Sequence, residues 1–281
     1  MSNIKYLLLR RTAQIGLMFL YFGANAYGWN ILAGTFGTSY IFGVIPLADP
    51  YTTLQVLATG FVLGADVLLG ALIITMFYFV VGGRAFCAWV CPINMVTDLA
   101  NWLRRKFNLD KEEVNYRFIK RSARYWILGL GLLVSALVGV AAFEVVSPIT
   151  IMQRGLIFGF GMGGTVVIAI FLFDLFGVKN GWCGHLCPLG AAYSIIGSKS
   201  IVRVKHNHEA CTACMDCKVV CPENQVLHMI DKESIAVTDG ECTNCGRCVD
   251  VCNDDALAFG IRSFVKGVKT ESKDEALVRC I

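Results

Sequence analysis

Charged residues are scarce in this chain of 281 residues: only 16% are Asp, Glu, Lys or Arg, against about 25% in average soluble domains. The net charge of +4 is too small to indicate a nucleic-acid partner. The sequence has no C-x-x-C-H motif for haem attachment. His206, His208 and His228 lie near the C-terminal cysteines rather than in apolar stretches, which argues against a haem held by two histidines.

Apolar residues are abundant, at 56% of the chain with a mean hydropathy of +0.59. Four stretches approach the roughly 20 apolar residues that cross a bilayer core of about 30 Å. We therefore predict an all-α polytopic membrane bundle of four transmembrane helices, in contact with membrane lipid. The predicted spans are residues 13–33, 61–81, 125–143 and 156–176.

The distribution of Lys and Arg predicts an orientation for such a bundle. Basic residues precede the first stretch and are frequent after the second and fourth, whereas residues 34–60 contain none. Basic loops favour the cytoplasmic side. The pattern predicts a multi-pass protein of the cell inner membrane with both termini cytoplasmic.

Two internal duplications divide the chain. Residues 77–92 align without gaps to residues 173–188, and residues 209–221 resemble residues 239–252. We predict a transmembrane domain at 1–198 built from a duplicated two-helix unit. A cytoplasmic ferredoxin-like domain is predicted at 199–265, followed by a tail at 266–281.

Eight of the thirteen cysteines form two runs of C-x2-C-x2-C-x3-C. This spacing wraps three corners of a [4Fe–4S] cluster, and the fourth cysteine of such a run binds the other cluster. Zinc sites favour pairs of C-x2-C instead. The sequence therefore predicts two [4Fe–4S] clusters in a bacterial ferredoxin-like domain. The predicted ligands are Cys211, Cys214, Cys217 and Cys252 for cluster one, and Cys242, Cys245, Cys248 and Cys221 for cluster two.

A second cysteine pattern, C-x3-C-P, occurs once in each copy of the first duplication. On a helix the two cysteines of a motif would share one face. Parallel duplication would bring Cys87, Cys91, Cys183 and Cys187 together. Soft thiolates gathered at one point select zinc or iron–sulfur sites. Three interpretations remain open: a third metal or iron–sulfur site, a redox dithiol couple, or cysteines without a ligand.

Several segments together resemble NapH, the family of ferredoxin-type membrane subunits of periplasmic nitrate reductase systems. They are GGRAFCAWVCPINMVTDLANWLRR, RGLIFGFGMG, FLFDLF, GWCGHLCPLGAAYSIIG and ECTNCGRCVDVC, and the resemblance runs from Arg10 to Gly260. It implies a quinol dehydrogenase subunit that takes electrons from quinol. These would pass toward a periplasmic iron–sulfur partner of the NapG type and then to nitrate reductase, in nitrate respiration.

A quinol site needs a proton acceptor, for which Asp66, Glu144 and Arg154 are the candidates. The alternative is that each is a charge at the level of the lipid head groups. Two other functions also fit the sequence. The chain could be a cytoplasmic-side reductase for metal or cofactor assembly, since the C-x3-C-P motifs also occur in such proteins. It could instead be a redox sensor or anchor without catalysis.

Overall fold

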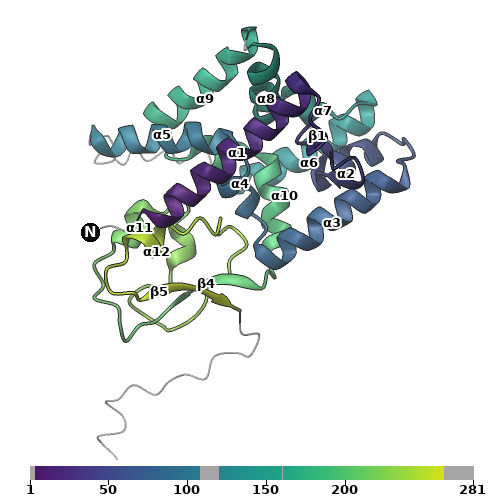
Figure 1. The fold of residues 1–281 in the computed structure, drawn as a ribbon. Coiled ribbons are helices and arrows are strands. Elements are labelled where there is room, and N and C mark those ends of the chain that lie inside the picture. The colour runs from purple at the N-terminus through teal and green to yellow at the C-terminus, as the bar shows by residue number, and fades with distance from the viewer. Residues whose placement is uncertain (1–3, 108–119, 160, 263–281) are drawn as a thin grey trace, which may run out of the picture.

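The computed structural model describes residues 4–107, 120–159 and 161–262, which form a helical part above a smaller part that carries both cysteine runs (Figure 1). Helix α1 (Lys5–Tyr27) begins beside the smaller part and crosses the helical part. The longer helices that follow are α2 (Pro50–Ala58), α3 (Ala65–Val81), α5 (Ile93–Lys106), α6 (Ala123–Val138), α8 (Pro148–Phe158), α9 (Gly164–Phe176) and α10 (Pro188–Gly197). Short helical turns between them are α4 (Ala85–Trp89), α7 (Ala142–Val146), η2 (Gly161–Gly163) and η3 (Trp182–Leu186).

In the described part of the chain, no helix is both long enough and apolar enough to cross a membrane. This finding contradicts two predictions, the four-helix transmembrane bundle and the multi-pass location in the cell inner membrane. We therefore correct both.

The predicted spans differ from the observed helices because hydropathy does not detect backbone breaks. Helix α1 stops where Gly28 adopts the left-handed conformation, with φ of 70°. Helix α3 has 17 residues, and α6 has 16 and ends at Gly139 with φ of 77°. The fourth stretch is split between α8 and α9, since Gly159 has φ of 92°, and α9 keeps 13 residues. Glycine adopts these angles at little cost and so ends helices.

A three-stranded antiparallel sheet also shows that the fold is not all-α. Its strands are β1 (Leu32–Gly34), β2 (Thr38–Ile41) and β3 (Ile45–Ala48), in the order β1-β2-β3. Ser39 pairs with Leu47, and Thr38 with Ala48. The strand β3 packs on α3 and leads directly into Asp49, the N-cap of α2.

The duplication is visible in the order of elements: α3, α4 and α5 in the first copy correspond to α9, η3 and α10 in the second. The two copies interlock, because α5 packs on α9 and α10 packs on α3. Their backbones approach closely at Gly83, where an added Cβ would lie 1.8 Å from the carbonyl oxygen of Tyr193. This packing places the two C-x3-C-P motifs side by side.

The smaller part contains a two-stranded antiparallel sheet of β4 (Val202–His206) and β5 (Leu257–Ile261). Between these strands come α11 (Asp216–Val220), η4 (Asn224–Leu227) and α12 (Arg247–Val251). Val204, Leu227, Ile230 and Val237 form a small buried core against the cysteines. The predicted domain boundary at 198/199 falls between α10 and β4, and the predicted tail at 266–281 lies outside the described residues.

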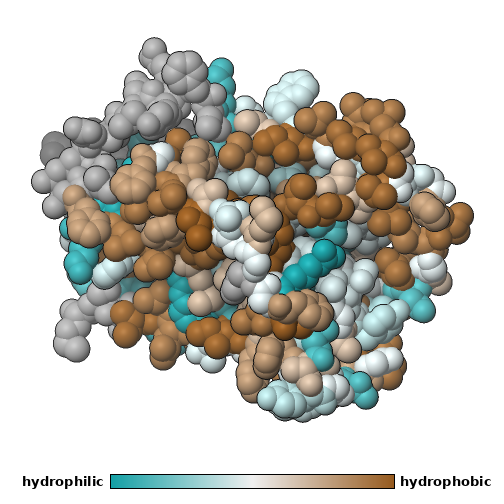
Figure 2. All heavy atoms as spheres, turned by 90° about the horizontal axis from the view of Figure 1, so that it is seen from above, coloured by the Kyte–Doolittle hydropathy of each residue, from teal (hydrophilic) through white to brown (hydrophobic). Residues whose placement is uncertain are grey.

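Apolar side chains cover much of the outside of the helical part. Figure 2 shows wide hydrophobic areas on the face seen from above, with smaller hydrophilic patches between them. Leu69 and Leu72 of α3, Leu133 and Leu137 of α6, and Ile168 of α9 are all exposed. Exposed apolar areas of this extent mark interaction surfaces.

Candidate functional site

The two cysteine runs form matched structures that pack against each other. Helices α11 and α12 are in contact, and each begins after a residue with positive φ, Met215 at 64° and Gly246 at 76°. Each helix ends at the fourth cysteine of its run, Cys221 or Cys252, in extended conformation. The two runs therefore have the same local fold and lie against each other.

The structure gathers the eight cysteines into the two groups assigned from spacing. Burial, followed by the nearby Cys214, Cys252 and Cys211, raises the pKa of Cys217. The other four cysteines line one cavity: Cys221, Cys242, Cys245 and Cys248. Each group thus takes three cysteines from one run and the fourth from the other run. Ligation of iron by these groups stays a prediction.

The backbone around both groups suits an anionic cluster. Ala213 and Asn244, at equivalent positions of the two runs, have φ of 56° and 46°. Left-handed residues within a turn direct successive N–H groups into one concavity, which binds anions. The second turn is fixed by Asn244, whose Nδ2 donates to the carbonyls of Val81 at 2.8 Å and Val202 at 2.9 Å.

A four-iron cluster fits this arrangement better than a single ion does. Among the residues that the structure describes, no three His, Cys, Asp or Glu side chains could together hold one metal ion. In a cluster each thiolate binds a different iron, so the sulfurs surround the group rather than meet at a point. All twelve described cysteines are free of disulfides. A cluster bound here would supply one-electron chemistry.

The C-x3-C-P cysteines form a third group, in the helical part. All four line one buried pocket with Phe86 and Trp182. The predicted arrangement of each pair on one helix is wrong, because α4 ends at Trp89, before Cys91, and the second motif lies in the π-helical turn η3 and in Cys187 beyond it. The duplicated elements nevertheless bring the two motifs together.

Burial dominates the chemistry of this group. It raises the pKa of Cys187 to about 12, and burial with the neighbouring Cys87 and Cys187 raises the pKa of Cys91 well above its ordinary value. Neutral thiols in this pocket resist exchange with dissolved disulfides, since the thiolate is the nucleophile. A bound metal would deprotonate them. Since no three described ligands converge on one metal ion, the buried thiols favour an iron–sulfur cluster over a single ion or a dithiol couple.

One buried arginine lies between the third group and cluster two. Arg84 is 1% exposed, and its Nη2 donates to the carbonyl of Cys183 at 3.0 Å. Its Nη1 donates to Glu223 Oε1 at 2.7 Å and to the carbonyl of Glu241 at 2.9 Å. The Arg84 charge lowers the pKa of both Cys87 and Cys242, although burial is the larger effect and raises both. Arg121 and Arg124 also pair with Glu223.

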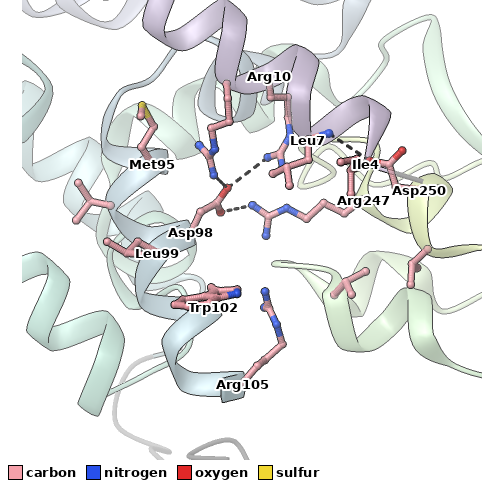
Figure 3. A pocket seen from close by; sticks show the side chains of 14 residues that line it. Ile4, Leu7, Arg10, Met95, Asp98, Leu99, Trp102, Arg105, Arg247 and Asp250 are labelled. Atoms are coloured by element: carbon pink, nitrogen blue, oxygen red, sulfur yellow. Dashed lines mark hydrogen bonds and ion pairs between the residues drawn. The ribbon is translucent and has the colours of Figure 1, made fainter. Parts of the chain in front are cut away.

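A second ion cluster joins α1, α5 and α12 (Figure 3). Arg10, Arg11 and Arg247 converge on Asp98. Burial alone would raise the pKa of Asp98, but the three guanidinium groups hold it below its usual range. These residues line a cavity of about 660 Å³ whose remaining wall is largely apolar. The cluster fixes the start of α1 against the smaller part.

The three predicted proton acceptors lie in different places. Asp66 and Arg154 are exposed, in the first turn of α3 and in α8. Glu144 accepts from Thr150 Oγ1 at 2.6 Å and from Thr52 Oγ1 at 3.3 Å. The same Thr52 hydroxyl donates to the buried Asp49 at 3.1 Å. Sequence reasoning missed Asp49, because an Asp-Pro pair before a helix reads as an ordinary N-cap.

Comparison with protein families agrees with the duplicated organisation. Residues 63–110 and 159–205 both match the 4Fe-4S binding domain family, one copy for each C-x3-C-P motif. Residues 203–253 match the 4Fe-4S dicluster domain family and contain both cysteine runs. No solved structure matches the chain.

Curated relatives match almost the entire chain. It is 44% identical to the ferredoxin-type protein NapH of Escherichia coli over 262 residues, which is 92% of this chain and 90% of the relative. It is 43% identical to NapH of Haemophilus influenzae, with the same coverage. It is also 46% identical to the methylamine utilization ferredoxin-type protein MauN of Methylorubrum extorquens, over 79% of this chain and 77% of the relative. At this identity over nearly its whole length, the chain belongs to the NapH family of ferredoxin-type proteins.

Proposed function

We propose that the chain oxidises a quinol and passes the electrons through its cysteine-bound iron–sulfur groups to a NapG-like iron–sulfur protein that serves nitrate reductase. The general function, electron transfer by a ferredoxin-type iron–sulfur protein, follows from the family and from the matched 4Fe-4S domains. The donor and the acceptor are the proposed parts.

The position of Arg84 is the observation that carries this proposal. Its guanidinium bonds to the backbone at Cys183 and at Glu241, which precedes Cys242. The third cysteine group and cluster two are therefore separated by little more than one side chain. An electron that enters the helical part has a short route to the smaller part, where the two remaining cysteine groups lie.

The residues of the chain have separate roles in this scheme. The twelve described cysteines would hold the clusters, and the turns at Ala213 and Asn244 would direct N–H groups at them. Hydrogen bonds to cluster sulfurs raise the reduction potential. The positive charges of the buried Arg84 and the partly exposed Arg247 would favour the reduced, more negative state of a neighbouring cluster.

A second destination for the electrons is supported by the relatives. Identity to MauN, a protein of methylamine utilization, is as high as identity to NapH. The same internal electron path would then serve an acceptor in methylamine utilization. Reduction of purified NapG by the quinol-reduced chain would favour the first destination.

Anaerobically purified protein tests the proposal. We expect about eight iron atoms from the two ferredoxin-like clusters, with any cluster in the third group adding to that number. Addition of a quinol should bleach the cluster absorption and produce EPR signals of reduced clusters. Stoichiometric zinc without iron would overturn the cluster assignment. Reduction by dithionite but not by any quinol would overturn the donor and leave electron transfer standing.

A further inference from the structure

A cavity of about 320 Å³ lies among α1, the three-stranded sheet, α3 and α10. Its size falls within the range of small-molecule sites, about 300 to 1,000 Å³. Most of its lining is apolar, and no Lys or Arg is among the lining residues that the structure describes. Five lining residues carry polar groups: Tyr21, Ser39, Asp49, Tyr78 and Tyr193. An apolar cavity with a few convergent polar groups suits a ring that carries two oxygens.

Packed aromatic rings separate this cavity from the third cysteine group. Phe86 and Tyr193 stack with ring centroids 4.7 Å apart, and Tyr78 packs edge-on against Tyr193 at 5.1 Å. Phe86 lines both this cavity and the pocket of Cys87, Cys91, Cys183 and Cys187. A molecule in the cavity would lie one layer of side chains from those cysteines.

Asp49 is the single carboxylate among the described residues that line the cavity. It is 7% exposed; its Oδ1 accepts from the Tyr193 hydroxyl at 2.9 Å, and its Oδ2 accepts from the Thr52 backbone N–H at 2.8 Å. Among the described residues no Arg or Lys forms a salt bridge with Asp49, and the Glu144 charge raises its pKa further. Tyr51, Tyr78 and Tyr193 also interact with its charge. Burial raises the pKa of Asp49 to about 6.

We propose that this cavity binds the quinol head group and that Asp49 is the proton acceptor for its oxidation. The inference rests on the proposed function, which supplies the quinol. The cavity beside Asp98 is unsuitable for this chemistry although it is larger, because three arginines already pair with that carboxylate.

The arrangement accounts for every proton and electron of the step. Oxidation of a quinol to a quinone breaks two O–H bonds and releases two protons and two electrons. Asp49 accepts one proton and passes it through the Thr52 hydroxyl to Glu144, which is partly exposed. Asp49, deprotonated again, can then accept the second proton. The cysteines of the third group would hold an oxidised iron–sulfur group across the aromatic layer, and such groups would take up the two electrons one at a time.

Asp49→Asn tests the assignment in the full, cluster-loaded protein. Asn retains the helix cap and the shape of the side chain but cannot accept a proton. We expect dithionite to reduce its clusters as in the wild type, and decylubiquinone to bind within about threefold. The rate of cluster reduction by decylubiquinol should fall at least about 100-fold, the usual contribution of a general base. The wild-type rate should rise with pH through about 6, and the variant should lose this dependence.

Two further variants distinguish the outcomes. Asp66→Asn removes an exposed carboxylate outside the cavity and should behave as the wild type. Leu47→Phe narrows the cavity from the partly exposed strand β3, and should weaken decylubiquinone binding at least tenfold while dithionite reduction persists. If quinol reduces the wild type and both cavity variants equally well, the site assignment is wrong. If quinol fails to reduce the wild type, the proposed donor is wrong instead.

Discussion

Asp49 is a helix cap and a buried carboxylate at the same time, and these roles have opposite energetic signs. The N-cap bond from the Thr52 N–H stabilises α2. Burial, however, disfavours the charged form and raises the pKa from 3.8 to about 6. The folded protein therefore binds the Asp49 proton more tightly than the unfolded chain does. Stability from this group is complete below about pH 4 and is lost as pH rises through about 6.

A pH-dependent unfolding experiment tests this sign. We expect the wild type to lose up to about 3 kcal/mol of unfolding free energy between pH 4 and pH 7 through this group, because its pKa is about 6 in the folded protein and 3.8 in an exposed carboxyl. Asp49→Asn should not show this loss. The unfolding free energy of the variant relative to the wild type should therefore increase with pH. Urea unfolding followed by tryptophan fluorescence at several pH values measures it. Parallel pH profiles would contradict the assignment.

The third cysteine group gives a second prediction at this scale. Cys183→Ser or Cys87→Ser removes one soft ligand from a buried pocket. We expect electron transfer from quinol to the C-terminal clusters to be abolished, because the group lies between the cavity and those clusters. Iron bound by the eight ferredoxin-like cysteines should be retained. EPR of dithionite-reduced variants checks the clusters, and full quinol-driven reduction would show that this group carries no electrons.

The sequence predicted the cysteine groups but not Asp49, and the reason is physical. Metal ligands on a short run have fixed spacing, so the arrangement of the cysteines from Cys211 to Cys221 can be predicted from the local sequence. The hydrogen bonding and the pKa of Asp49 depend on residues that are distant in the sequence, Tyr193 and Glu144. Glu144 was predicted as a candidate acceptor, but its link to Asp49 through Thr52 depends on the tertiary fold.

Helix ends and helix packing limit sequence-based prediction at the level of elements. Hydropathy located the apolar stretches near α1, α3, α6 and α9, but it extended them through Gly28, Gly139 and Gly159, where the helices end. The short sheet was missed, because β1 begins inside the first predicted stretch. The duplication was predicted correctly, since both copies fold into the same order of elements and match one family.

The contact between the two copies predicts that adding a side chain at Gly83 lowers the unfolding free energy. An added Cβ would lie 1.8 Å from the Tyr193 carbonyl oxygen and 2.4 Å from the Gly197 nitrogen, both backbone atoms that cannot rotate away. We expect Gly83→Ala to cost about 1–3 kcal/mol of unfolding free energy. The control is Gly129→Ala in α6, where nothing lies within 4 Å and a gain of about 0.5–1 kcal/mol is expected. Thermal unfolding measures both, and equal midpoints would show that the copies do not meet at Gly83.

At the scale of the whole molecule, buried ion pairs join the helical part to the smaller part. Arg84 and Arg124 from the helical part pair with Glu223, and Arg124 also pairs with Glu241. Trp89 Nε1 donates to the Asn244 carbonyl at 3.0 Å, beside Cys242 and Cys245. Buried pairs add little net stability but fix geometry. This interface therefore holds the third cysteine group and cluster two at a constant separation, as electron transfer between them requires.

Arg84→Gln tests whether this interface also sets reduction potentials. A positive charge about 8–16 Å from the centre of a cluster, at an effective dielectric constant of about 20, favours the reduced state by about 1–2 kcal/mol. Its removal should therefore lower a one-electron potential by about 40–90 mV. Since Arg84 acts on both Cys87 and Cys242, we expect two signals in an EPR-monitored redox titration to shift together. Lys199→Gln removes the same charge from an exposed position, where solvent screens it, and should shift neither signal. If the two variants give equal potentials, Arg84 does not lie between two redox groups, and the electron path proposed through it would have to be abandoned.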